Sequence, residues 1–180
     1  SCTAALHLSL IAAGIKPGDE VITTPMSFVA TTNAICMTGA TLVFVDVEKN
    51  TGNIDVGLIE KAITKKTKAI LPVHLYGQMV DMKRLIPLAK KHKLFIIEDS
   101  AHALEAKRDG IKPGQKSYGA CFSFYATKSI TSAEGGAFTT NNKSSAKLVK
   151  KLRSHGITSE LAQRMRTGLK TYDVDALGWK

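Results

Sequence analysis

The amino-acid sequence predicts an α/β fold built around a mostly parallel central sheet. Short apolar runs that are typical of strands alternate along the chain with runs of helical periodicity. Residues 94–97, Leu-Phe-Ile-Ile, are apolar at every position, as in a strand that is covered on both faces. No internal repeat, low-complexity tract or linker divides the 180 residues, so we expect a single domain over residues 1–180.

The first half of the chain contains three expected helix–strand pairs. Leu6, Leu10 and Ala13 recur on one helical face, and the segment Lys-Pro-Gly-Asp at residues 16–19 predicts a turn into the first strand. Gly39 is expected to end the second helix. The expected elements are helix 3–13, strand 20–24, helix 28–37, strand 41–47, helix 56–63 and strand 69–75.

The second half continues the alternation and then places two strands in succession. The expected elements are helix 82–92, strand 94–98, strands 121–125 and 137–140, and helix 145–152. The chain opens on a helix N-cap without a preceding strand, and residues 173–180 stop without a closing element. We therefore expect a fragment of a longer protein.

Composition narrows the class of protein. The net charge of +10 comes from lysines spaced as on exposed helices, without interleaved aromatic residues, so we expect no nucleic-acid partner. No apolar stretch approaches the roughly 18 residues of a membrane span, and no secretory signal opens the chain. The three cysteines have no metal-ligand or disulfide spacing, so we expect no metal site and a cytoplasmic location.

Asp99 is the first candidate site residue. It lies in the segment Glu-Asp-Ser-Ala-His at residues 98–102, directly after the apolar strand, where open parallel sheets bind ligands. A partly desolvated carboxylate there needs a cationic partner. A pyridinium nitrogen would serve, since the carboxylate keeps it protonated and the ring then acts as an electron sink. The alternative is a helix N-cap by Asp99.

Lys128 is the second candidate. It follows the aromatic strand Phe-Ser-Phe-Tyr, and a lysine in such a place can form a Schiff base when burial and nearby cations lower its pKa. The alternative is an ordinary surface lysine. Gly135 and Gly136 would allow the backbone to approach a ligand closely. A third candidate is the start of the first helix, where free N–H groups and Thr3 suit a phosphate.

Taken together, these segments resemble the DegT/DnrJ/EryC1/StrS family of sugar aminotransferases, which have the type I fold of pyridoxal 5'-phosphate (PLP) enzymes. The matching segments occur in the family's order and cover nearly the whole chain: SCTAAL, GIKPGDEVITTPMSFVAT, GATLVFVDV, PVHLYGQMVDM, IIEDSAHA, FSFYATKSIT, EGGAFTT, LRSHGI and LGWK. The resemblance implies a three-layer sandwich with a seven-stranded sheet, here the PLP-binding large domain without the upstream segment and the smaller C-terminal domain.

The resemblance also implies residue roles. Lys128 matches the lysine that binds PLP as a Schiff base and moves protons between cofactor and substrate. Asp99 matches the carboxylate paired with the pyridinium nitrogen, and His102 matches a contact near the ring oxygen. Phe28 matches the aromatic residue stacked on the ring. The residues that match the phosphate site are Thr3, Ala4 and Ser123.

Simpler roles remain open for some of these positions. Phe28 could belong to the core, and His102 could be a structural histidine. His74 is interpreted mainly as structural, and Tyr125 as either core or cavity wall. The sequence also departs from the family pattern, with Cys2 where glycine is common and Ser129 where asparagine often follows the lysine.

The activity that the resemblance implies is transfer of an amino group, with glutamate as the expected donor, to a keto-sugar carried on a nucleotide. A homodimer is the expected assembly. One alternative is a PLP-dependent sugar dehydratase of the same fold, although those relatives carry histidine in place of Lys128. The other is a non-catalytic regulatory relative, against which the joint presence of Lys128, Asp99 and His102 argues.

Overall fold

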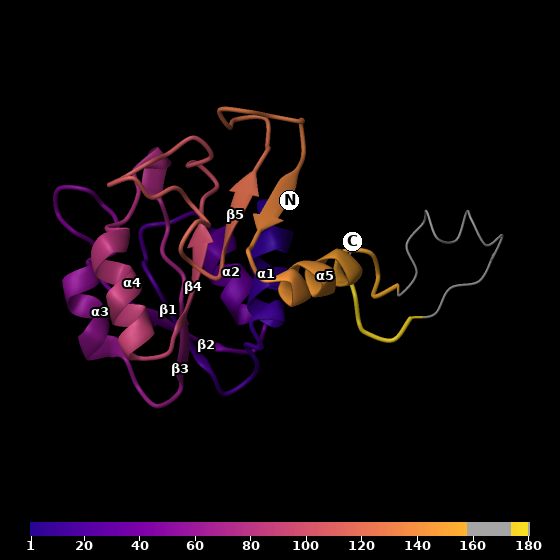
Figure 1. Cartoon of the computed structure of the whole chain (residues 1–180), viewed down its shortest axis with the longest axis horizontal. Coiled ribbons are helices and arrows are strands. Elements are labelled where there is room, and N and C mark those ends of the chain that lie inside the picture. The colour runs from indigo at the N-terminus through magenta and orange to yellow at the C-terminus, as the bar shows by residue number, and fades with distance from the viewer. Residues whose placement is uncertain (158–173, 180) are drawn as a thin grey trace.

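The computed structural model of the protein describes residues 1–157 and 174–179 and has the predicted α/β architecture (Figure 1). Six strands form one sheet in the order β2-β1-β3-β4-β5-β6. Neighbours from β2 to β5 are parallel, and β6 pairs with β5 in the antiparallel direction. The strands are β1 (Glu20–Thr23), β2 (Thr41–Phe44), β3 (Thr67–Ile70), β4 (Phe95–Asp99), β5 (Gly119–Ser123) and β6 (Gly136–Thr139).

Helices cover both faces of the sheet, which makes the predicted three layers (Figure 1). On one face, Leu10 of α1 and Ile35 of α2 pack with Val21 of β1. On the other face, Leu85 of α4 packs in a second cluster with Ile22, the next residue of β1. Successive strand residues thus enter opposite layers, which is why adjacent positions such as Val21 and Ile22 are both apolar and buried. The helices are α1 (Cys2–Ala12), α2 (Val29–Cys36), α3 (Val56–Ala62), α4 (Met82–Lys91) and α5 (Lys143–Leu152).

Several predicted strands prove shorter at their carboxyl ends. The segment predicted as strand 69–75 forms β3 only as far as Ile70, since Pro72 has no N–H to donate to a ladder. The chain then turns through a short 3-10 segment, Leu75–Gly77, in which Tyr76 has a φ of 51°. Predicted strands 41–47 and 121–125 end at Phe44 and Ser123. Within the described residues the sheet has six strands, not the seven that the resemblance implies.

The early strand ends matter because they release polar residues into loops at one edge of the sheet. The parallel strands β1, β3, β4 and β5 all finish at this edge. The N-terminus of α1 reaches the same edge, held by Ser1, whose Oγ accepts from the Ala4 N–H at 3.2 Å. In the part of the chain that the structure describes, no helix has the length and apolarity to cross a membrane.

Candidate active site

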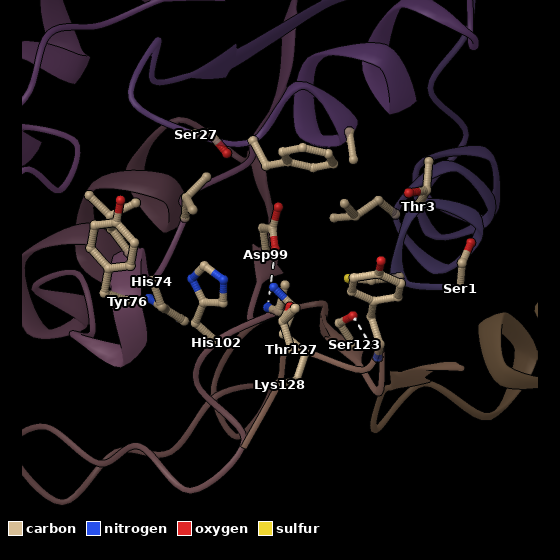
Figure 2. Close-up of a pocket in the computed structure, with 18 of the residues that line it drawn as sticks. Ser1, Thr3, Ser27, His74, Tyr76, Asp99, His102, Ser123, Thr127 and Lys128 are labelled. Carbon is tan, nitrogen blue, oxygen red and sulfur yellow. Dashed lines mark hydrogen bonds between the residues drawn. The ribbon is translucent and has the colours of Figure 1, made fainter. Parts of the chain in front are cut away.

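A cavity of about 690 Å³ opens at the carboxyl edge of the parallel strands (Figure 2). Loops after four strands contribute to it, together with the start of α1. It brings together six of the seven predicted site residues. They are Thr3, Phe28, Asp99, His102, Ser123 and Lys128. Ala4 is exposed and is not among the lining residues, and its N–H is already used by Ser1.

Asp99 ends β4 and lies at the floor of the cavity, with 6% of its surface exposed. The Ala101 N–H donates to Oδ1 at 3.1 Å, and the Thr31 hydroxyl donates to Oδ2 at 2.7 Å. The first contact is an Asx turn, and residues 100–106 form turns rather than a helix, so the helix-cap alternative is wrong. None of the ion pairs found among the described residues involves Asp99. A buried carboxylate without such an ion pair suits a cationic group on a ligand.

Lys128 lies in the connection between β5 and β6, in a turn where its N–H donates to the Tyr125 carbonyl at 3.0 Å. The side chain is half-buried and extends from this turn into the cavity toward Asp99 (Figure 2). Its positive charge is close enough to lower the pKa of both His102 and the Cys2 thiol, although burial raises the Cys2 value overall. Lys128 is therefore a cavity residue and not an ordinary surface lysine.

His102 stands beside Lys128 with its ring parallel to that of Tyr76, at 5.7 Å between centroids and 8° between planes. Burial lowers the pKa of His102, the charge of Lys128 lowers it further, and Asp99 partly offsets both. At neutral pH the imidazole is consequently uncharged and carries one donor and one acceptor nitrogen. A group of this kind suits a neutral or anionic oxygen on a ligand.

Phe28 is the residue before α2 and is 77% exposed, so the interpretation as a core residue is wrong. It lines the cavity, as does Tyr125, which is 47% exposed and forms part of the wall. An aromatic face open to a cavity is a surface on which a flat ring can stack.

Thr3 and Ser123 lie at the other end of the cavity, beside the start of α1 (Figure 2). The positive end of the helix dipole and the first N–H groups of α1 face the same region, which suits a phosphate. The structure gives a reason for glycine at position 136 other than the close approach to a ligand that we expected. A side chain there would collide with the backbone of Ser1 and Cys2, so the glycine lets β6 pack against α1.

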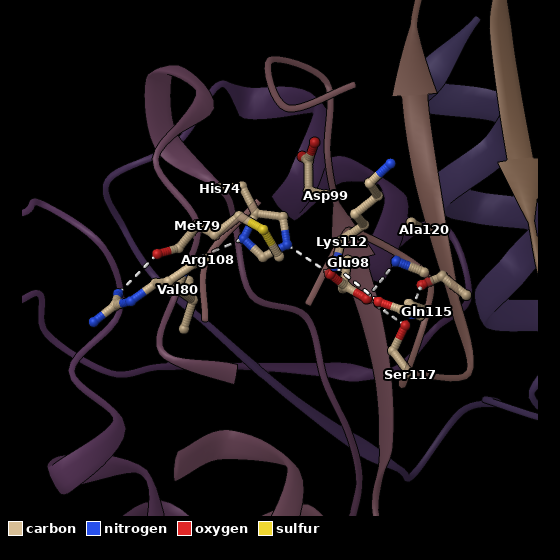
Figure 3. A network of polar contacts seen from close by, with 12 residues as sticks. His74, Met79, Val80, Glu98, Asp99, Arg108, Lys112, Gln115, Ser117 and Ala120 are labelled. Carbon is tan, nitrogen blue, oxygen red and sulfur yellow. Dashed lines mark hydrogen bonds and ion pairs between the residues drawn. The ribbon is translucent and has the colours of Figure 1, made fainter. Parts of the chain in front are cut away.

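A second polar cluster lies behind Asp99, on the opposite side of β4 (Figure 3). Glu98 is 1% exposed and accepts from His74 Nε2 at 2.6 Å, from the Gly114 N–H at 2.8 Å and from the Ser117 hydroxyl. Because the Val80 N–H donates to Nδ1 of His74, the histidine carries its proton on Nε2 and donates to Glu98. This cluster agrees with the structural interpretation of His74 and gives Glu98 a purely internal role.

Sequence reasoning missed Thr31 and Tyr76, which contact two of the predicted site residues. Thr31 holds Asp99, and Tyr76 packs on His102. Thr31 could have been suspected, since it lies on the same face of its helix as the apolar Ala34 and Ile35, where a buried hydroxyl needs a partner. Tyr76 carries no periodic signal, because its place depends on a tight turn with a positive φ.

The sequence pattern of the DegT/DnrJ/EryC1/StrS aminotransferase family matches residues 1–177. The chain belongs to this family. GDP-perosamine synthase of Caulobacter vibrioides is 46% identical to it over 86% of the chain and 42% of the synthase. UDP-4-amino-4-deoxy-L-arabinose–oxoglutarate aminotransferase of Shewanella sediminis is 43% identical over 93% of the chain and 43% of the relative. The chain thus spans less than half the length of these relatives.

Solved structures of sugar aminotransferases match the fold over the whole chain. The putative sugar aminotransferase Spr1654 of Streptococcus pneumoniae, in its PMP form, matches 100% of this DegT/DnrJ/EryC1/StrS chain and 50% of its own, with a TM-score of 0.91 and 36% identity. The PLP form of the same protein gives a TM-score of 0.89 and 35% identity. The family cofactor is PLP, and the fold is that of the type I enzymes.

The cavity of this family member fits PLP on its own chemistry. A carboxylate with no ion pair among the described residues, an open aromatic face, a primary amine and a helix start meet there. They match a pyridinium nitrogen, a flat ring, an aldehyde and a phosphate in turn. Of the predicted phosphate residues, Thr3 and Ser123 are placed to take part, whereas the Ala4 N–H would first have to leave Ser1.

Proposed function

We propose that this chain is the cofactor-binding part of an enzyme that transfers an amino group from an amino acid to a keto-sugar carried on a nucleotide. The observation that carries the proposal is the convergence of Lys128, Asp99 and Phe28 on one cavity. A PLP site in a family of sugar aminotransferases needs these three functions: an amine, a counter-charge and a stacking face. PLP supplies an electron sink and a carrier for the amino group.

Each side chain has a task that follows from its position. Lys128 Nζ would hold the cofactor through its aldehyde and would be the base that moves a proton at the reacting carbons. Asp99, at the floor of the cavity, would keep the ring nitrogen protonated, and Phe28 would hold the face of the ring. His102, uncharged at neutral pH, hydrogen-bonds the ring oxygen beside Lys128.

The substrate class is supported by the names of the two relatives, one a GDP-sugar synthase and one a UDP-sugar–oxoglutarate aminotransferase. The second name pairs oxoglutarate with the amino sugar, which supports glutamate as the donor here. The described cavity walls contain no arginine, the usual ligand for a substrate carboxylate, which favours a sugar as the second substrate. The presence of Lys128 disfavours the dehydratase alternative, whose members carry histidine there.

The proposal extends to the whole protein. In this proposal, residues 1–180 belong to one PLP-binding domain of a longer chain, since the relatives are more than twice as long. A second copy completes the assembly as a homodimer, supported by two exposed apolar residues, Met26, which lines the cavity, and Val29 at the start of α2. Free, widely separated cysteines support a reducing compartment, the cytoplasm.

Reduction with borohydride tests the attachment site. The complete enzyme is loaded with PLP, reduced, digested and mapped, and we expect the cofactor on the peptide that contains Lys128. Lys128→Ala should lose both the label and turnover. Lys116→Ala changes an exposed lysine in the loop before β5, at the end of that strand opposite the cavity, and should keep both. A label on any other lysine contradicts the assignment.

The acceptor is tested by half-reactions. The complete enzyme is converted to its amino form with glutamate, and keto-sugar nucleotides or simple keto acids are then added. Return of the original visible absorbance with a sugar nucleotide is the expected result. Fast return with keto acids other than 2-oxoglutarate, and none with any sugar nucleotide, would contradict the proposed substrate class.

A further inference from the structure

We infer that Thr31 and Ser27 are positioning residues that hold the Asp99 carboxylate against the cofactor ring nitrogen. The inference rests on the proposed function, and it assigns a task to two hydroxyl groups outside the predicted site. Thr31 lies in the first turn of α2 and is completely buried. Its hydroxyl contacts Asp99 of β4, which is 68 residues away in the sequence.

The hydrogen bonds run in one direction. The Thr31 hydroxyl donates to Asp99 Oδ2 at 2.7 Å and so uses its only proton. The Ser27 hydroxyl, 2.6 Å from Thr31 Oγ1, must then be the donor in that contact. Ser27 is half-buried and lines the cavity, so the chain Ser27 to Thr31 to Asp99 links the cavity wall to its floor. Donors in series strengthen one another, and the last one acts on a charge.

The chain also joins two of the residues that contact the ring. Phe28 stands one helical turn before Thr31, and the Thr31 N–H donates to the Phe28 carbonyl at 3.1 Å. The bond from Thr31 to Asp99 therefore fixes the start of α2, and with it the stacking face, relative to the counter-charge. The Ala101 N–H holds the other oxygen of Asp99, so Thr31 decides whether the carboxylate can rotate.

The test uses the complete enzyme with PLP and four variants. Thr31→Val keeps the shape and removes the hydroxyl, Thr31→Ser keeps the hydroxyl and removes the methyl group, and Ser27→Ala removes the first donor. Thr32→Val is the matched control, because the neighbouring Thr32 hydroxyl donates only to the Val29 carbonyl, at 2.9 Å. The readouts are the dissociation constant of PLP and the pH midpoint of its visible absorbance.

For Thr31→Val we expect PLP binding about 10–100-fold weaker, the scale of losing a hydrogen bond to a charged group. The absorbance midpoint should move to higher pH, because a less protonated ring repels a second proton on the lysine-linked nitrogen less strongly. Thr31→Ser should stay within about threefold of the starting enzyme, and Ser27→Ala should shift both readouts in the same direction as Thr31→Val by less. Thr32→Val should leave both unchanged.

Two results would overturn the inference. One is a Thr31→Val enzyme whose PLP affinity and absorbance midpoint equal those of the starting enzyme. The other is a Thr31→Ser enzyme as impaired as Thr31→Val, since packing and not the hydroxyl would then matter. If Thr31→Val does not fold, Ser27→Ala decides by the same criteria. A starting enzyme that binds PLP without any visible lysine-linked absorbance refutes the proposed function itself, which is a separate outcome.

Discussion

Glu98 and Asp99 are adjacent carboxylates on one strand, and their surroundings differ in one respect. Glu98 has a donor that cannot rotate on each oxygen, the Gly114 N–H on Oε1 and His74 Nε2–H on Oε2, and Oε1 also accepts from the Ser117 hydroxyl. Asp99 has one fixed donor, the Ala101 N–H, and one hydroxyl that can rotate, on Thr31. The comparison teaches that the carboxylate serving the protein has a fixed donor on each oxygen, whereas the one facing the cavity has a fixed donor on one oxygen only.

The largest expected effect comes from neutralising Asp99, the carboxylate that faces the cavity. Asp99→Asn should lower turnover of the complete enzyme by about a hundredfold or more, the scale of removing one preorganised electrostatic contact. Folding should tolerate the change, since the Thr31 hydroxyl can turn and accept from the new amide. Steady-state kinetics and urea unfolding measure the two effects. A turnover equal to that of the starting enzyme would remove Asp99 from the reaction.

The matched change at the buried carboxylate, Glu98→Gln, should lower stability and leave turnover nearly unchanged. In Glu98→Gln, the amide NH₂ must face either His74 Nε2–H or the Gly114 N–H, and His74 cannot shift its proton because the Val80 N–H occupies Nδ1. We expect the free energy of unfolding to fall by about 2–3 kcal/mol, with turnover per folded molecule changed only a few-fold. Equal stability of the Asp99→Asn and Glu98→Gln proteins would contradict the comparison.

Phe28→Ala tests whether a second cavity residue, like Asp99, contributes to ligand binding more than to folding. Because Phe28 is mostly exposed, its removal should cost the apoprotein little stability. Retention of PLP should weaken by about 1–2 kcal/mol, the contribution of covering and stacking an aromatic ring. Equilibrium dialysis of PLP measures it, and an unchanged dissociation constant would show that the ring is held by other groups.

The smallest effect concerns pH. Burial lowers the pKa of His102, and Lys128 adds to this, so the unfolded chain binds more protons than the folded one below the ordinary histidine range. The free energy of unfolding should therefore decrease as pH falls through about 6.5. His102→Gln should make that dependence shallower. It should not abolish it, because burial also lowers the pKa of His7. Urea titrations at several pH values test this, and an identical slope in the variant would contradict it.

The sequence was sufficient for the architecture, because short apolar runs such as residues 94–97 alternate with segments that carry helical periodicity and caps. The three-layer arrangement is confirmed, as is family membership. The carboxyl ends of the strands were harder to predict from the sequence. β3 was predicted to reach residue 75, and the positive φ of Tyr76 that turns the chain depends on packing around the turn. Apolar composition cannot distinguish the last ladder residue from the first loop residue.

The candidate site was predictable where a residue adjoins a strand in sequence, as with Asp99, Ser123 and Lys128. It was not predictable where helix α2 supplies the partner. The contact between Thr31 and Asp99 depends on how α2 is placed over β4, which only the folded chain specifies. Glu98 and Asp99 formed a single acidic segment in sequence, and only the pleat of β4 assigns them to opposite sides.

Gly136 has a consequence for exchanging parts between relatives. The hairpin of β5 and β6 carries Lys128, and the glycine at its second strand rests on the backbone of Ser1 and Cys2. A chimera that received this hairpin from a relative with any larger residue there would displace the first turn of α1. Both ends of the cavity would then shift together, although no residue that faces it had been altered. Hairpin and helix start therefore form one exchangeable unit, and grafts should move them as a pair.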